Sequence, residues 1–91
     1  MRLPRRFDAS ASRAEIVRLL PAATGCAAIR EAGDTYSGPH WQLRLTPLPP
    51  LVIALVRLER HCVEFEFEGM SAAEENAFMD RFTRHFQRGG G

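Results

Sequence analysis

Polar and apolar residues alternate most cleanly in two stretches of the sequence, 41-WQLRLT-46 and 63-VEFEFE-68. In the first stretch Trp41, Leu43 and Leu45 point to one side, and the polar residues between them point to the other. This period of two residues is typical of a strand that is buried on one face only. The second stretch follows the same rule, so the two stretches predict an antiparallel sheet with one apolar and one polar face.

The apolar face of such a sheet needs a covering layer, and the C-terminal part of the sequence supplies a helix for it. Ser71 and Glu74 have the spacing of a capping box, in which two side chains bind the unpaired amides at a helix start. A helix is predicted from this box to Arg88, because Gly89 commonly ends helices. Its apolar stripe has the spacing of one helix face and consists of Phe78, Met79, Phe82 and Phe86.

An earlier helix is predicted by a second capping box, which Ser12 forms with Glu15. Pro21 and the pair Thr24-Gly25 predict the end of this helix within about one further turn. Its apolar face consists of Ile16, Val17, Leu19 and Leu20.

From Cys26 onward the chain is predicted to be extended, with a turn at residues 37–39. Three prolines, Pro47, Pro49 and Pro50, are expected to end the strand that begins at Trp41. Residues 51–58 then predict another strand, because Val and Ile favour strands, although a buried helix is the alternative. We expect this strand to pair with residues 63–68 as a hairpin. In that register Leu58 lies opposite Val63, Val56 opposite Phe65, and Arg57 opposite Glu64.

Together these elements predict an α+β two-layer sandwich with the order β-α-β-β-β-β-α. The antiparallel sheet has three to four strands, and both helices pack on one of its faces. Residues 3–7 are the candidate for the first strand, at an edge of the sheet where Pro4 is tolerated. We expect one globular domain over residues 1–88 and a flexible glycine tail at residues 89–91.

Composition excludes several classes of protein. All 12 cationic side chains are Arg, and the formal net charge is only +1, so the chain as a whole has no strong field toward nucleic acid or an anionic membrane. The N-terminal residues lack the apolar segment of a secretory signal, and the longest aliphatic run, residues 51–56, is too short to span a bilayer. These features predict a cytoplasmic protein without a membrane partner, in which both cysteines stay reduced.

No recognisable catalytic motif is present, and the interpretation we favour is that the protein is not an enzyme and has no cofactor. Cys26, His61 and Cys62 lack the spacing of a structural zinc site, but they remain an alternative if the fold brings them together as a metal or thiol site. Alternating glutamates at residues 64, 66 and 68 could act as a base or bind a cation. A solvated sheet face neutralised by Arg57 and Arg44 explains them better.

A basic cluster is predicted at the end of the last helix, where Arg81, Arg84 and Arg88 lie with His85. If the N-terminal Arg2, Arg5 and Arg6 lie nearby, they extend this cluster into a patch that could contact phosphate. Weak nucleic-acid binding through these arginines is therefore one alternative function.

An apolar surface is the main functional prediction. Leu51, Ile53 and Leu55 are expected to point away from the helices, and large exposed apolar patches usually mark interfaces. The alternatives are that the N-terminal segment with Leu3 and Phe7 covers them, or that the hairpin register differs. The leading hypothesis is a small non-enzymatic protein-interaction or accessory module, whose partner is another protein or a second copy in a two-fold dimer.

Overall fold

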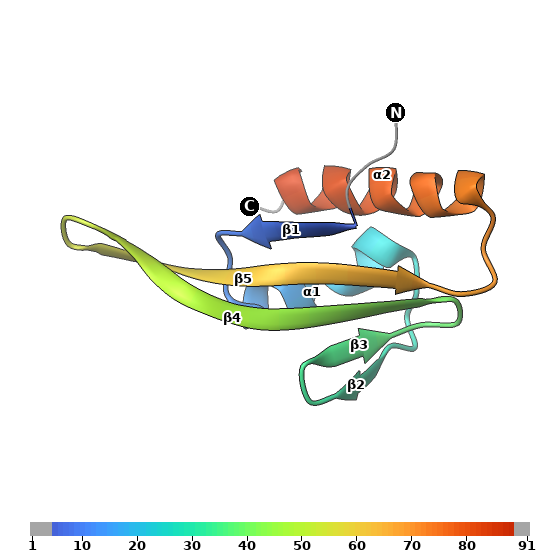
Figure 1. Ribbon diagram of the computed structural model, residues 1–91, viewed down its shortest axis with the longest axis horizontal. Coiled ribbons are helices and arrows are strands. Elements are labelled where there is room, and N and C mark those ends of the chain that lie inside the picture. Colours follow the sequence, from blue (N-terminus) through green and yellow to red (C-terminus); the bar gives the residue numbers. More distant parts are fainter. Residues whose placement is uncertain (1–4, 89–91) are drawn as a thin grey trace.

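The computed structural model describes residues 5–88, with side chains to Phe86, and confirms an α+β fold in which two helices pack with an antiparallel sheet (Figure 1). The sheet has five strands in the order β1-β5-β4-β3-β2, one more than the upper end of the predicted count. The elements are β1 (Arg6–Ala9), α1 (Arg13–Thr24), β2 (Arg30–Ala32), β3 (Thr35–Ser37), β4 (Trp41–Ile53), β5 (Val56–Phe67) and α2 (Ala72–Arg88).

The core lies between the helices and what we call the inner face of the sheet. On this face Leu43 lies directly opposite Phe65, and Leu45 lies opposite Val63, as the alternation predicts. The Phe65 ring packs edge-on against Phe82 of α2 with the ring centroids 4.8 Å apart. Buried apolar residues come from both helices and from four strands: Ala9, Ala11, Ile16, Leu20, Ala23, Tyr36, Trp41, Leu43, Leu45, Val63, Phe65, Met79 and Phe82.

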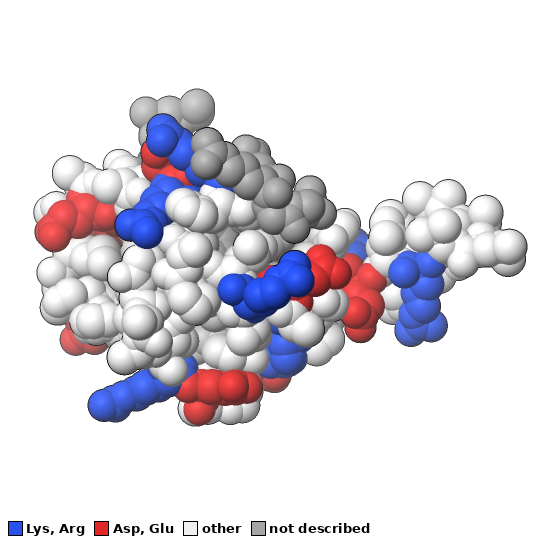
Figure 2. Space-filling view, turned by 180° about the vertical axis from the view of Figure 1, so that it is seen from behind, with Lys and Arg blue, Asp and Glu red and all other residues white. Residues whose placement is uncertain are grey.

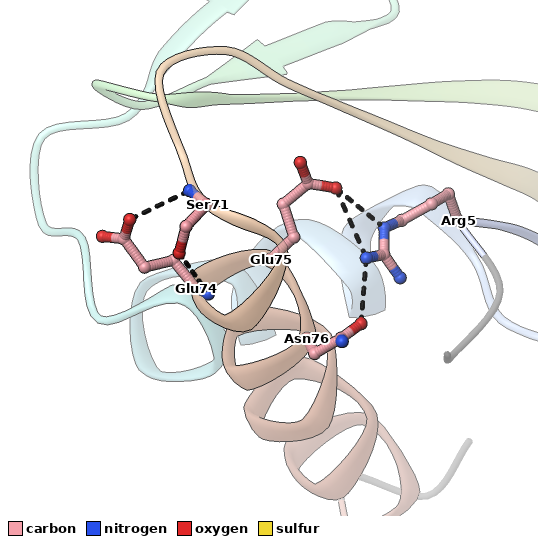
Figure 3. Close-up of polar contacts among 5 residues, drawn as sticks. All are labelled: Arg5, Ser71, Glu74, Glu75 and Asn76. Carbon is pink, nitrogen blue, oxygen red and sulfur yellow. Dashed lines mark hydrogen bonds and ion pairs between the residues drawn. The ribbon is translucent and has the colours of Figure 1, made fainter. Parts of the chain in front are cut away.

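Both helices begin where the capping boxes predict. The Ser12 hydroxyl accepts a hydrogen bond of 3.2 Å from the amide of Glu15 at the start of α1. At the start of α2 the bonds are reciprocal, because the Glu74 amide donates to the Ser71 hydroxyl and the Ser71 amide donates to the Glu74 carboxylate (Figure 3). Helix α1 ends at Gly25, which adopts the left-handed φ of 71° that glycine permits.

The edge strand β1 begins later than the predicted segment. It pairs antiparallel with β5, with Phe7 opposite Val63, and it forms one edge of the sheet as expected. Phe7 packs under the end of α2, where its ring centroid lies 6.1 Å from that of Phe86. The predicted contributions of Leu3 and Pro4 lie outside the described residues, as does the predicted glycine tail at residues 89–91.

Strands β2 and β3 form a short hairpin that the sequence pattern does not resolve from the extended chain after Cys26. Gly33 turns the chain with a φ of 62°. Tyr36 is the one residue of the hairpin that is buried, and the Arg13 guanidinium donates to its hydroxyl and to Asp34. These bonds to Tyr36 and Asp34 raise the pKa of Arg13 above its ordinary value, so the hairpin is tied to the start of α1 by a group that stays charged.

The predicted hairpin after the prolines is wrong. Strand β4 does not end at Pro47 but continues to Ile53, and the chain turns at residues 54–55 instead of residues 59–62. Leu58 consequently lies opposite Leu51, and Arg57 lies opposite Val52. The prolines are tolerated because the pairing of β4 with β3 ends before them and a bulge between Leu48 and Leu51 absorbs one extra residue.

The far end of this hairpin projects from the rest of the molecule (Figure 1). We call residues 49–59 the arm, and every one of them is exposed. The projection makes the molecule elongated, with principal extents of 45 × 31 × 19 Å. The arm is thus a two-stranded ribbon that no helix of the described chain covers.

The reciprocal bonds at Ser71 lead to a stability prediction. Replacement of Ser71 by Ala removes the acceptor for the Glu74 amide, and we expect a loss of about 1 kcal/mol in the free energy of unfolding, measured by urea denaturation. The matched control is Ser10→Ala, at an exposed serine for which the structure shows no cap. Equal stability of the two variants would contradict this role for Ser71.

The charge of Glu74 gives a separate prediction on pH. Hydrogen bonds from the Ser71 amide and hydroxyl lower the pKa of Glu74 below its ordinary value of 4.5. A carboxylate with a lowered pKa stabilises the fold above the unfolded-state pKa, and the stabilisation is lost as the pH falls through the folded-state pKa. We expect Glu74→Gln to reduce the loss of stability between pH 6 and pH 3, taken as about the range of carboxylate titration. Parallel curves of stability against pH for wild type and Glu74→Gln would disprove this role of the Glu74 carboxylate.

Candidate protein-interaction site

The register of the arm separates its side chains into two faces. Leu51 lies opposite Leu58, and Ile53 lies opposite Val56, so these residues share one face of the ribbon. We call this set of four side chains the aliphatic face. Val52 and Arg57 lie opposite each other on the other face. The arm is therefore amphipathic, with an uninterrupted aliphatic surface on one side.

The bulge in β4 sets the direction of the aliphatic face. Odd-numbered residues of β4 up to Pro47 share the inner face with odd-numbered residues of β5. Beyond Leu48 the extra residue changes this relation, and odd-numbered residues of β4 then lie opposite even-numbered residues of β5. In β5 the alternation is unbroken, so Val56 and Leu58 continue the side of the strand that carries Glu64. The aliphatic face is consequently continuous with the face of the sheet that points away from the helices.

The aliphatic side chains of the arm are more exposed to solvent than such side chains usually are. Leu55 at the turn is fully exposed, and Ile53 and Val56 expose 59% and 56% of their surfaces. All the large exposed hydrophobic residues of the described chain belong to this one segment: Leu51, Val52, Ile53, Leu55, Val56 and Leu58. A contiguous apolar patch of this kind on a monomer usually marks an interaction site.

The sequence pattern predicts only part of this apolar patch. Leu51, Ile53 and Leu55 are exposed on the arm, and their role in binding stays a prediction. The pattern of residues 51–58 predicts one strand with the hairpin turn after it, and this register places Val56 and Leu58 on the inner face instead. The useful signal was the spacing of Pro47 and Pro49, since prolines two apart lie on the same side of a strand and are compatible with an edge.

The predicted basic cluster at the end of α2 is largely occupied by contacts within the molecule. Arg81 donates a hydrogen bond of 3.1 Å to the carbonyl of Ala22 in α1, and Arg84 forms an ion pair of 2.9 Å with Asp80. The Nδ1 atom of His85 lies 3.0 Å from the carbonyl oxygen of Arg81. The side chain of Arg88 lies beyond the described side chains.

Among the described N-terminal arginines, Arg5 and Arg6 have partners away from this cluster. Arg5 contacts Glu75 and Asn76 at the opposite, N-terminal end of α2 (Figure 3), and Arg2 lies outside the described residues. Figure 2 shows arginines interspersed with acidic residues over the face that it displays. On this face the structure therefore shows no continuous basic patch.

The three candidate metal or thiol ligands have separate partners. His61 was predicted in a loop, but it lies buried in the middle of β5, where its Nδ1 is 2.8 Å from the carbonyl of Ala11. Cys62 is 3% exposed, and its sulfur accepts a hydrogen bond of 3.4 Å from Arg6, a contact that raises the pKa of Arg6. The Cys26 thiol is directed to the carbonyl of Ala28. Within residues 5–88 no three His, Cys, Asp or Glu side chains converge as metal ligands.

The glutamates on the polar face of β5 differ in their cross-strand partners. Glu64 lies opposite Arg44 of β4 and opposite Arg6 of β1, and Glu66 lies opposite Gln42. Arg57, which the predicted register placed beside Glu64, lies on the arm instead. On the polar face of the sheet, Glu64 thus has a residue of opposite charge beside it on both neighbouring strands.

Surface depressions offer little for chemistry on a small molecule. One of about 200 Å³ lies at the end of the sheet remote from the arm, between residues 37–42 and 66–68. Pockets that enclose small molecules typically measure about 300–1,000 Å³. A larger one of about 430 Å³ is lined by Ala28, Arg30 and residues 37–39, with Arg30 its sole charged side chain.

Comparison of the chain with protein-family models, with characterised proteins and with solved structures returned no match. Among the residues described, no helix has the combination of length and apolar character that crossing a bilayer requires. The fold and the site therefore define the chain only as an α+β sandwich with a protruding apolar β-arm.

The surroundings of the cysteines predict their reactivity. Cys26 is half-buried, whereas the Arg6 side chain contacts the buried sulfur of Cys62. We expect a thiol reagent to modify Cys26 first in the folded protein and Cys62 only slowly, as followed by mass spectrometry of the labelled peptides. Arg6→Ala should accelerate labelling of Cys62 alone, with Arg18→Ala, at an exposed arginine of α1, as the control. Equal rates at both thiols in wild type would contradict the observed burial.

Proposed function

We propose that this protein is a non-enzymatic interaction module that binds another protein chain through its arm. The exposure of the aliphatic face supports this proposal most directly, because it is a large, ordered apolar surface without a covering element in the described chain. The aliphatic face is also held in place in advance, since both strands of the arm continue directly from the core strands. A binding element of this kind loses little conformational freedom when it binds.

The size of the aliphatic face is sufficient to drive association. Complete burial of one exposed Leu, Ile or Val side chain contributes roughly 1.5–3 kcal/mol, and these four still expose 41%, 59%, 56% and 38% of their surfaces, so together they contribute on the order of 3–6 kcal/mol before the entropic costs of association. Leu55 at the tip adds a further side chain that is fully exposed in the free molecule. Because the contribution is apolar, the complex should persist at high salt.

A non-catalytic role is supported by the distribution of titratable groups. The histidines and cysteines of the described chain contact backbone atoms or arginine, and Glu64 of the sheet lies opposite an arginine on both neighbouring strands. A catalytic site would need such groups to converge in a cleft. The arm itself carries Arg57 and Glu59 as its charged residues, and these suit recognition better than chemistry.

The test is capture of partners by a tagged protein from lysate of the native host at low and high salt. We expect a protein, including the chain itself, to be retained at high salt by wild type and lost by the double variant Ile53→Ser/Leu58→Ser. Titration of the purified partner should then show affinity weakened by about tenfold or more, since two aliphatic contacts are lost. The loss of stability should be no more than about 2 kcal/mol, because Ile53 and Leu58 expose 59% and 38% of their surfaces and lie outside the core.

The matched control is Val52→Ser. It shortens an exposed aliphatic residue of the same arm on the opposite face, and it should leave capture unchanged. Retention of the same proteins by the double variant would refute the proposal. Capture of nucleic acid that is lost at high salt would favour a role for the arginines instead.

A further inference from the structure

The two edges of the arm differ in their capacity to pair with another strand. Beyond Leu45, whose amide donates to the Asp34 carbonyl, the edge of β4 contains Pro47, Pro49 and Pro50. Proline has no amide hydrogen, and natural sheets use it to prevent edge pairing. The edge of β5 has no proline between Val56 and Arg60. Only the β5 edge of the arm can therefore supply a regular ladder of hydrogen bonds.

Within residues 5–88 this β5 edge is open over a defined length. Strand β1 covers β5 from Glu64 to His61, where it ends opposite Ala9. The amide of Phe65 donates to the Arg5 carbonyl on this side, so odd-numbered residues of β5 direct their backbone groups toward the β1 side. Arg57 and Glu59 continue this series beyond the end of β1. Their amides and carbonyls are accordingly directed along the open edge, which runs from Val56 to Arg60.

We propose that a second copy of this chain pairs with this open edge, so that two β5 strands run antiparallel across a two-fold axis at Leu58. This inference rests on the proposed function, because it names the partner of the same arm. An antiparallel pair of identical strands is a self-complementary contact, which closes as a dimer without further growth.

The position of the two-fold axis is fixed by two independent features. The open edge from Val56 to Arg60 is centred on Leu58, so a second copy in this register fills it and its turn arrives where β1 ends. In the same register Arg57 lies opposite Glu59 of the second copy, and Glu59 lies opposite Arg57 of the second copy. An axis at Arg57 or at Glu59 would instead place like charges directly opposite each other, which destabilises a sheet.

The hydrogen-bond pattern agrees with this register. Arg57 and Glu59 of the second copy form a pair in which both backbone groups face the junction, so they exchange two hydrogen bonds. Leu58 faces Leu58 of the second copy as the closely spaced type of pair, with Cα atoms about 4.5 Å apart. Val56 of the second copy lies opposite Arg60, whose guanidinium forms an ion pair of 3.5 Å with Asp8. The Arg60 stem is then available to cover the valine.

Pairing also changes the state of the aliphatic face. A two-stranded ribbon is marginal in water, whereas three or more strands with an apolar face are stable. The two arms together form a four-stranded sheet whose aliphatic faces lie side by side, joined at the two Leu58 side chains. The dimer thereby reduces the exposure of the apolar surface and satisfies the backbone groups of the open edge.

Charge exchange tests the register. By size-exclusion chromatography with light scattering, we expect wild type to have the mass of two chains, and we expect Arg57→Glu and Glu59→Arg each to weaken the dimer by about tenfold or more. An equimolar mixture of these two variants should recover the dimer, because each glutamate at these positions again faces an arginine. Recovery on mixing cannot arise from misfolded chains. Glu66→Arg, on the same strand but opposite Gln42, is the control and should leave the mass unchanged.

A cysteine at the axis gives a second, geometric test. Leu58→Cys places two thiols at a Cα separation that a disulfide permits, so mild oxidation should give a covalent dimer. Val56→Cys should not, because residue 56 faces residue 60 of the second copy. Wild type treated in the same way controls for Cys26 and Cys62.

The outcomes separate this inference from the proposed function. A single-chain mass for wild type at high micromolar concentration would overturn the dimer, as would a dimer that ignores both charge variants or crosslinks equally at residues 56 and 58. If the dimer is overturned but wild type captures a different protein that Ile53→Ser/Leu58→Ser does not capture, the arm remains an interaction element with another occupant. If that variant keeps both self-association and the capture of partners, the dimer and the proposed function are both overturned.

Discussion

The packing of Phe82 against Phe65 is the contact around which the other layers are arranged. Phe65 belongs to the central strand pair and Phe82 to α2, and both side chains are almost fully buried. Phe7 of β1, Phe78 and Phe86 join the same aromatic cluster, so it links an edge strand, a central strand and a helix. Aromatic pairs in such tilted and edge-on arrangements contribute beyond their buried area, by about 0.5–1.5 kcal/mol each. A small domain gains much of its stability from a cluster of this kind.

These contacts hold the core together at one end of the central strands. The other end of these strands takes no part in the core. Strands β4 and β5 pair from Trp41 and Phe67 through to Ile53 and Val56, but the helices cover only the first part of this length. Past His61 the ribbon has no β1 beside it and no helix under it. The arm is held in position by its continuity with the core, and its side chains are available for contacts outside the molecule.

The parts of the fold that were predictable depend on local patterns. Ser71 with Glu74, and Ser12 with Glu15, locate both helix starts because a capping box involves residues only three apart. The alternation around Trp41 and Phe65 likewise identifies the inner face. The hairpin turn was misplaced because its position depends on the pairing of two strands along their whole length, and on whether β4 is an edge where Pro47 is tolerated. The exposure of Leu51 and Ile53 was anticipated through an incorrect register, and Val56 and Leu58 could not be assigned to the same face without the true one.

The single extra residue of β4 near Pro49 and Pro50 has an evolutionary meaning. Because the bulge places two residues of β4 opposite one residue of β5, deletion of one of them would restore regular pairing while Leu51 stays opposite Leu58 and Ile53 stays opposite Val56. Such a change would leave every buried residue of the core in place. The length of β4 at this point can therefore differ by one codon between descendants of this chain without a change in the core or in the two faces of the arm.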